Sequence, residues 1–341
     1  MKKSIYLLGM AVAALSSCSQ SDVVEMPESR AIGFSSFVNN NTRGAVTEIG
    51  SKDALTDFYI YGYHSSTTPV FENIKVTNGN PVKTAYWLAG KNYNFAAYAN
   101  GNDGILGGVT FTPVSNQLQF ATYTPDNAKD LVAAISSQIS GDAQITTNNP
   151  VGLSFKHMLS QVKFTFTSTD SPAYTMKISD IKISNAVKTA TGTLTGIGNA
   201  ATVAWSNGTG EGEAKGVYDF GTLADIAAEG THATSCLVIP QDNASLEVTF
   251  TATFFDASSS EAQPIKKGNF KASLAYTKGE VTGTEDNKWT PGYRYNYTAT
   301  INADKIDPSL EDQKITFEVE VVDTWKDGNK TGTTPTPVPQ P

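Results

Sequence analysis

The residue types that usually carry out catalysis or bind metals are few in this chain, and their spacing matches no familiar reaction centre. Its three histidines are far apart and stand in no acid-flanked pattern; they are His64, His157 and His232. Neither a Gly-x-Ser-x-Gly elbow, nor His-Glu-x-x-His, nor a phosphate loop with its lysine occurs. Asp126 and Asp130 stand near each other but lack the alternating oxygen ligands of a calcium loop. We therefore expect no enzymatic activity, no bound metal and no cofactor.

Cys18 is the residue with the clearest expected chemistry. A basic start, an apolar run from Ile5 to Leu15 and two serines precede it, which is the pattern of a secretory signal ending in a sequence that resembles a lipobox. The apolar run is shorter than the roughly 20 residues that cross a bilayer as a helix. We expect residues 1–17 to be removed as a signal peptide. Residues 18–30 should then form a tether, held on the outer membrane by acyl chains on Cys18.

The second cysteine, Cys236, lies in the apolar run Cys236-Leu237-Val238-Ile239. Once Cys18 carries lipid, neither an intramolecular disulfide nor a cysteine-based metal site can form. We expect Cys236 to be a buried, unreactive thiol.

Composition favours an all-β protein that does not bind nucleic acid. The formal net charge is −8 and no basic patch is evident. Charged residues make up only 17% of the chain and aromatic residues 10%, a balance that favours strands joined by turns over helices. The length is sufficient for two domains with cores of their own.

Strand signals are frequent, short and bounded by turn residues. Residues 162–167 alternate apolar Val162, Phe164 and Phe166 with polar neighbours, as a half-buried strand requires. Further strands are predicted at Asp57–Tyr63, Asn92–Ala99, Met176–Ser184, Leu246–Phe255, Tyr293–Ile301 and Lys314–Val322. Helical periodicity is limited to short turns near residues 127–135 and 156–161. Many strands with few helices predict β-sandwiches.

The predicted sandwiches divide the chain near residue 157. We expect an N-terminal β-sandwich over residues 31–157 and a C-terminal β-sandwich over residues 158–327. Residues 328–341 are rich in proline and should form an extended, disordered tail.

Seven short segments, in this order and behind the lipobox-like sequence, resemble the fimbrillin family of Bacteroidales surface lipoproteins, whose members build a type of pilus. They are Asn41–Ala45, Lys83–Trp87 with Tyr93–Tyr98, Asp130–Ala133, Phe155–Phe164, Trp289–Tyr297 and Val322–Trp325. The resemblance implies an all-β fold of two tandem transthyretin-like β-sandwich domains behind a lipoprotein signal peptide. It also implies a fimbrial subunit at the cell surface that serves adhesion.

The same resemblance implies a route of assembly. In that family an arginine-specific protease removes the leader and the first strand, and a strand from another pilus subunit fills the groove. In this chain the candidate first strand is Ala31–Phe37, with Ile32 and Phe34 facing the core. The candidate cleavage site is the bond between Arg43 and Gly44, in an asparagine-rich segment where an exposed loop is expected.

The C-terminal part favours a tip or accessory subunit over a shaft subunit. A shaft subunit should offer a spare apolar strand at its C-terminus. Here Lys314–Val322 should pair with Tyr293–Ile301, and nothing beyond Trp325 is apolar enough to donate. Host or bacterial surface molecules are candidate ligands for such a subunit.

Two functions of other classes are the alternatives. A glycan-binding surface lipoprotein on the outer membrane would show a cluster of solvent-facing tyrosine and tryptophan side chains. A secreted hydrolase on a β scaffold would show a cleft with converging carboxylates.

Replacing Cys18 with serine should release the protein from the membrane fraction, because no other residue is expected to anchor it. Mass spectrometry of the mature N-terminus should find acyl chains on Cys18, and a Cys236→Ser variant should remain membrane-bound. A mature N-terminus without lipid, starting beyond residue 18, would contradict the lipoprotein hypothesis.

Overall fold

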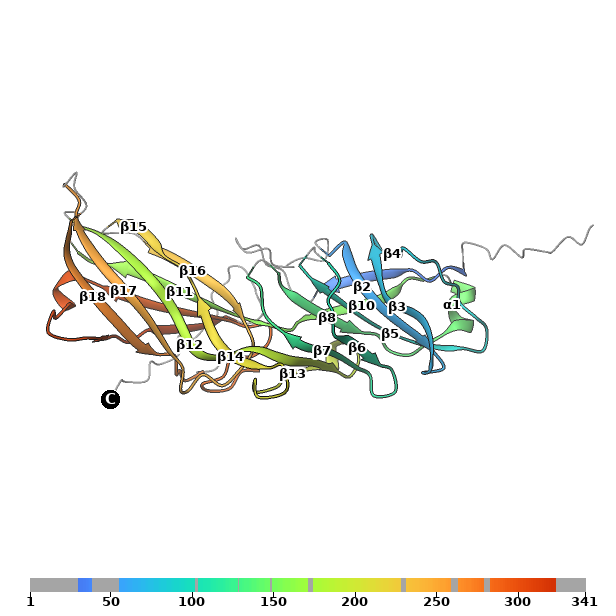
Figure 1. Ribbon diagram of the computed structural model, residues 1–341. Helices are drawn as coiled ribbons and strands as arrows, with labels where there is room; N and C mark the ends of the chain where they lie inside the picture. The colour runs from blue at the N-terminus through green and yellow to red at the C-terminus, as the bar shows by residue number, and fades with distance from the viewer. Residues whose placement is uncertain are drawn as a thin grey trace, which may run out of the picture.

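The computed structural model describes residues 30–38, 55–101, 104–127, 129–147, 149–170, 174–227, 231–258, 263–278 and 283–322. Cys18, Arg43, Gly44, the expected signal peptide and the proline-rich tail lie outside these residues. The predicted all-β class is confirmed, and Figure 1 shows an elongated molecule with two strand-rich lobes arranged end to end. None of the helices in the described parts of the chain is long and apolar enough to span a membrane.

The first lobe is built on an eight-stranded sheet in the order β1-β10-β8-β5-β2-β3-β4, with β9 paired to β5. Its strands are β1 (Phe34–Val38), β2 (Asp57–His64), β3 (Thr68–Thr77), β4 (Asn80–Pro81), β5 (Asn92–Asn100), β8 (Leu131–Ile135), β9 (Ile139–Ser140) and β10 (Val151–His157). A short helix, α1 (Gly141–Thr147), follows β9.

The central strands of this sheet, β5 and β8, are buried on both faces, as β5 illustrates. Tyr93, Phe95 and Ala97 share one face and join a core with the side chains of β1 and β10. Ala96 and Tyr98 point to the other face, where the hairpin of β6 (Val109–Thr112) and β7 (Gln117–Tyr123) covers them. Burial on both sides explains why eight of the nine residues of β5 are buried.

A nine-stranded sheet in the order β20-β18-β17-β12-β7-β6 extends through both lobes. Besides β6 and β7 it contains β12 (Tyr174–Thr195), β17 (Glu247–Asp256), β18 (Pro264–Ser273) and β20 (Gln313–Lys314), while β13 (Thr202–Trp205), β14 (Ala214–Asp219) and β15 (Leu223–Ala227) each pair with β12. The 22-residue β12 pairs with β17 over Tyr174–Ile183 and with β7 over Ala190–Thr195. One strand therefore belongs to the sheets of both lobes.

The second lobe is closed by a four-stranded sheet in the order β16-β11-β19-β21. Its strands are β11 (Ser160–Ser168), β16 (Thr231–Val238), β19 (Arg294–Ile301) and β21 (Glu318–Val322). The predicted alternation in β11 is confirmed, since Val162, Phe164 and Phe166 are fully buried in the core between this sheet and the nine-stranded one.

Several sequence-based boundaries need correction. The prediction of short helical turns near residues 127–135 and 156–161 is wrong. Residues 131–135 form β8, and residues 156–161 belong to β10, β11 and the connection between them. The expected strand Lys314–Val322 is two strands, since β20 pairs with β18 whereas β21 pairs with β19. Residue 157 does end β10. However, β7, which precedes residue 157, pairs with β12, which follows it, so the division into two domains stays a prediction.

Candidate functional site

The candidate first strand lies at the edge of the eight-stranded sheet. The strand β1 starts at Phe34 rather than Ala31 and pairs in parallel with β10, with Phe34 opposite Val151 and Val38 opposite Phe155. Ala31 forms an isolated bridge with Tyr86 instead.

Backbone hydrogen bonds hold the other side of this segment against residues 79–87. The Phe34 N–H donates to the Gly79 carbonyl at 2.9 Å, and the Ile32 N–H donates to the Ala85 carbonyl at 2.8 Å. The Trp87 N–H donates in turn to the Arg30 carbonyl at 2.9 Å. Residues 30–38 thus connect β10 with the far end of the same sheet and close the first lobe around its core.

Ile32 and Phe34 fill this core, with exposed fractions of 2% and 4%. The Phe34 ring packs edge-on against Phe95 and Phe71, at centroid distances of 5.3 and 5.9 Å. Burial of each side chain contributes about 1.5–3 kcal/mol, and an edge-to-face aromatic pair adds about 0.5–1.5 kcal/mol. The predicted core-facing orientation of both residues is confirmed, whereas displacement of the strand stays a prediction.

Gly79 sets how closely this segment can approach. Asn78 and Gly79 both have positive φ, 49° and 81°, as the tight turn between β3 and β4 requires. A Cβ atom on Gly79 would lie 2.4 Å from the Phe34 carbonyl oxygen. Sequence analysis missed this role: the Asn-Gly pair signals the turn, but nothing local signals its contact with Phe34.

At the other end of the chain, β21 is part of the second core. It pairs antiparallel with β19, which confirms the predicted partner, and Arg294 lies opposite Val322. Val319 and Val321 are 2% and 1% exposed. The described C-terminal strand is therefore committed to its own lobe.

Polar contacts gather near the junction of the lobes, within the first lobe between Asp130 and His157 and across the junction from Asn127 to β16. His157 Nδ1 lies 2.7 Å from Asp130 Oδ2, and both side chains are buried. The Asn127 amide bonds to the edge of β16, donating to Cys236 Sγ at 3.0 Å and accepting from the Leu237 N–H at 3.1 Å. The predicted burial of Cys236 is confirmed, and this burial raises the pKa of its thiol to about 11.

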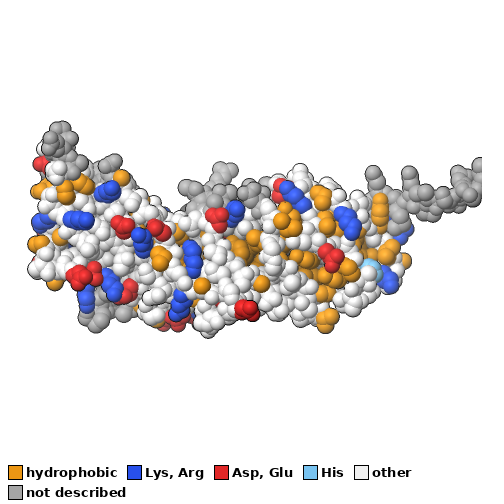
Figure 2. Space-filling model, in the orientation of Figure 1, with side chains coloured by type: hydrophobic (Ala, Val, Ile, Leu, Met, Phe, Trp, Pro, Cys, Tyr) orange, Lys and Arg blue, Asp and Glu red, His pale blue; other side chains and the backbone are white. Residues whose placement is uncertain are grey.

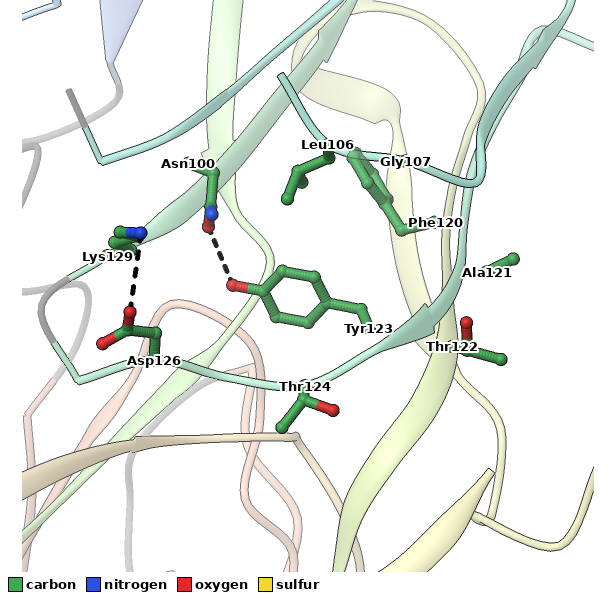
Figure 3. A pocket seen from close by; sticks show the side chains of 10 residues that line it. All are labelled: Asn100, Leu106, Gly107, Phe120, Ala121, Thr122, Tyr123, Thr124, Asp126 and Lys129. Atoms are coloured by element: carbon green, nitrogen blue, oxygen red, sulfur yellow. Dashed lines mark hydrogen bonds and ion pairs between the residues drawn. The ribbon is translucent and has the colours of Figure 1, made fainter. Parts of the chain in front are cut away.

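An open hollow of about 350 Å³ lies beside β7, and the side chains that line it are drawn in Figure 3. The Tyr123 hydroxyl donates to Asn100 Oδ1 at 2.9 Å, and Lys129 forms an ion pair with Asp126 at 3.6 Å. Burial raises the pKa of Tyr123, so its hydroxyl remains protonated at neutral pH. Asp126 and Asp130 thus bind different partners, Lys129 and His157, rather than converging on one site.

The surface offers little support for an aromatic binding shelf. Tyr174, 36% exposed, is the one aromatic residue among the exposed large hydrophobic side chains of the described chain. Figure 2 shows hydrophobic atoms gathered over the first lobe, and partly buried Tyr59 and Tyr63 pack against the cluster beneath β6 and β7. His64 packs against Tyr93, away from the bonded pair of His157 and Asp130.

Comparison with known proteins assigns most of the chain to one family. A profile of fimbrillin-like proteins matches residues 42–325, which confirms the resemblance inferred from the sequence segments. No curated protein matches the chain.

Several solved structures are similar to the chain. A candidate cell adhesion protein from Bacteroides uniformis has 17% identity and a TM-score of 0.45, and the match covers 88% of this chain and 100% of that one. One from Bacteroides ovatus has 14% identity, a TM-score of 0.45 and coverage of 88% and 99%. One from Parabacteroides distasonis has 10% identity, a TM-score of 0.45 and coverage of 87% and 98%.

A Gly79→Ala substitution should loosen β1 without changing its sequence, because the new Cβ atom would collide with the Phe34 carbonyl. Gly90→Ala is the matched control, since Gly90 also has positive φ (69°) but nothing lies within 4 Å of its Cβ position. Hydrogen exchange at the Phe34 and Ile32 amides should accelerate at least tenfold more in Gly79→Ala than in Gly90→Ala. Equal exchange in the two variants would show that Gly79 does not control docking of the strand.

Proposed function

Since the chain belongs to the fimbrillin-like family, we propose that it is a fimbrial subunit that assembles by strand exchange and serves adhesion. Family membership supports a fimbrial or adhesin role at the cell surface. The observation that carries the finer proposal is the segment of residues 31–38, which includes the short edge strand β1 and closes the core of the first lobe with Ile32 and Phe34.

Removal of β1 would create a definite acceptor. It would leave the outer edge of β10 without its parallel partner and would expose the aromatic cavity that Phe34 fills. An incoming strand restores both the backbone hydrogen bonds and the apolar burial. Its chemistry follows from residues 31–38: it runs parallel to β10 and carries an aliphatic and an aromatic residue two positions apart, as Ile32 and Phe34 do.

The arginine content supports Arg43 as the processing site. The chain has three arginines, Arg30, Arg43 and Arg294. Arg294 lies in β19 between two paired strands, and its guanidinium bonds to the Gln161 side chain. Arg30 precedes β1 and donates to the Trp87 carbonyl, so cleavage there would remove no part of the strand. Cleavage between Arg43 and Gly44 would separate β1 from the rest of the chain.

The proposed position in the fimbrium is the tip or an accessory site. Because β21 already supplies Val319 and Val321 to its own core, its release as a donor strand would unfold that lobe. Attachment to the outer membrane through lipid on Cys18 completes the proposal for the unassembled subunit.

The proposal also holds that the chain is not an enzyme. The buried contact between Asp130 and His157 is assigned a structural role, joining β8 to β10. Mature protein should show no turnover above buffer with ester, glycoside and peptide substrates. Robust turnover that disappears in a His157→Asn or Asp130→Asn variant of unchanged melting temperature would overturn this part of the proposal.

Clipping after Arg43 should convert the closed protein into an acceptor for a donor strand. An arginine-specific protease is added to the mature protein, followed by a labelled peptide of the sequence of residues 30–38. The clipped wild type and the clipped Arg30→Ala variant should both bind the peptide, whereas Arg43→Ala should keep β1 joined to the rest of the chain and should not bind the peptide. Peptide affinity should fall at least tenfold when the residue equivalent to Phe34 is alanine, because that ring fills the core.

Two results would count against strand exchange. One is equal peptide binding by clipped and unclipped protein. The other is binding that does not change when the aromatic residue of the peptide is replaced by alanine.

A further inference from the structure

A second cavity lies at the junction of the lobes, apart from β1. It is an open cleft of about 650 Å³, within the range of about 300–1,000 Å³ typical of small-molecule sites. Its walls come from three parts of the chain: the end of β10, residues 201–203 at the start of β13, and residues 283–292 before β19.

One wall carries a fixed positive charge. Lys156 Nζ donates to the carbonyl oxygens of Asn199 and Ala201, at 2.7 and 2.6 Å, which holds the ammonium group in place. Burial lowers its pKa because the charged form loses hydration. Within the described residues Lys156 forms no ion pair, so only the dipoles of these two carbonyl groups offset its positive charge. An anion that enters the cleft would be attracted to this charge.

Residues 283–292 supply both charged and uncharged polar groups to the cleft. Lys288 Nζ lies 3.0 and 3.1 Å from the two carboxylate oxygens of Glu285. The backbone of Thr290 is fixed, since its carbonyl accepts from Ser160 Oγ at 2.6 Å and its N–H donates to the Tyr295 hydroxyl at 2.7 Å. Its hydroxyl and that of Thr202, across the cleft, can donate to or accept from a ligand.

Apolar surface lies between these groups. Val203 and Pro291 line the cleft, and Gly292 places bare backbone against the His157 side chain. The cleft combines a carboxylate, a threonine hydroxyl and a lysine with a small apolar wall. This combination is complementary to a ring that has hydroxyls on its edge and C–H groups on its faces. A phosphate dianion matches less well, because the Glu285 carboxylate would repel it.

We propose that this cleft binds a carboxylate-bearing sugar, the chemistry of uronic and sialic acids. The ligand carboxylate binds Lys156, its hydroxyls bind Glu285 and Thr290, and its apolar face lies on Val203 and Pro291. The site is independent of β1, so clipping at Arg43 leaves it unchanged.

Calorimetric and NMR titrations of the unclipped mature protein test the site. The probes are glucuronic acid, galacturonic acid and N-acetylneuraminic acid. Glucose is the control for the carboxylate, because it is the neutral counterpart of glucuronic acid, and inorganic phosphate is the control for an anion without a sugar ring. At least one acidic sugar should bind at least tenfold more tightly than both glucose and phosphate. Binding of none of the acids, or preference for phosphate or glucose, overturns the proposal.

Three variants locate the binding. Lys156→Gln should weaken the acidic sugar at least tenfold, whereas Lys215→Gln, which changes an exposed lysine on β14, should bind as the wild type does. Thr290→Val keeps the backbone contacts and should weaken binding several-fold, which tests the site even if Lys156→Gln folds poorly. Wild-type affinity in both Lys156→Gln and Thr290→Val would place the ligand elsewhere and overturn the proposal.

Discussion

Backbone pairing along β12 is the interaction on which the arrangement of the molecule depends. This strand forms hydrogen bonds with β17 in the second lobe and with β7 in the first, so the lobes share one sheet rather than a flexible linker. The smaller contacts at the junction then become possible: Trp205 Nε1 donates to the Met158 carbonyl at 2.7 Å, and Asn127 bonds to the edge of β16. The walls of the junction cleft stand where they do because β12 holds both lobes.

Patterns within single segments of sequence predicted much of the fold. The alternation of Val162, Phe164 and Phe166 with polar residues predicted β11. One face of that strand packs on the core, and the other face is only partly buried. The candidate first strand, taken from the resemblance to the fimbrillin family together with the inward direction of Ile32 and Phe34, was placed within a few residues. The partner of β21 was also predicted, since both strands are rich in residues that favour a pleated sheet.

Contacts between distant segments could not be predicted in the same way. The pairing of β7 with β12 joins residues 67 to 78 positions apart, and neither strand carries a local signal that indicates the other as its partner. The contact of Gly79 with Phe34 and the three-part wall of the junction cleft arise only from the folded chain. The helix α1 has seven residues with two threonines, too short and too poor in helix formers to stand out from a strand-rich sequence.

The parallel pairing of β1 with β10 has a consequence for the order of events during biogenesis. Phe34 lies opposite Val151, so the first strand to be synthesised must wait for a partner more than a hundred residues further along the chain. Closing so long a loop is slow compared with forming the hairpin of β2 with β3 or that of β6 with β7. The segment nearest the N-terminus is thus among the last to dock. Until then the core of the first lobe lacks the side chains of Ile32 and Phe34 and stays open to solvent.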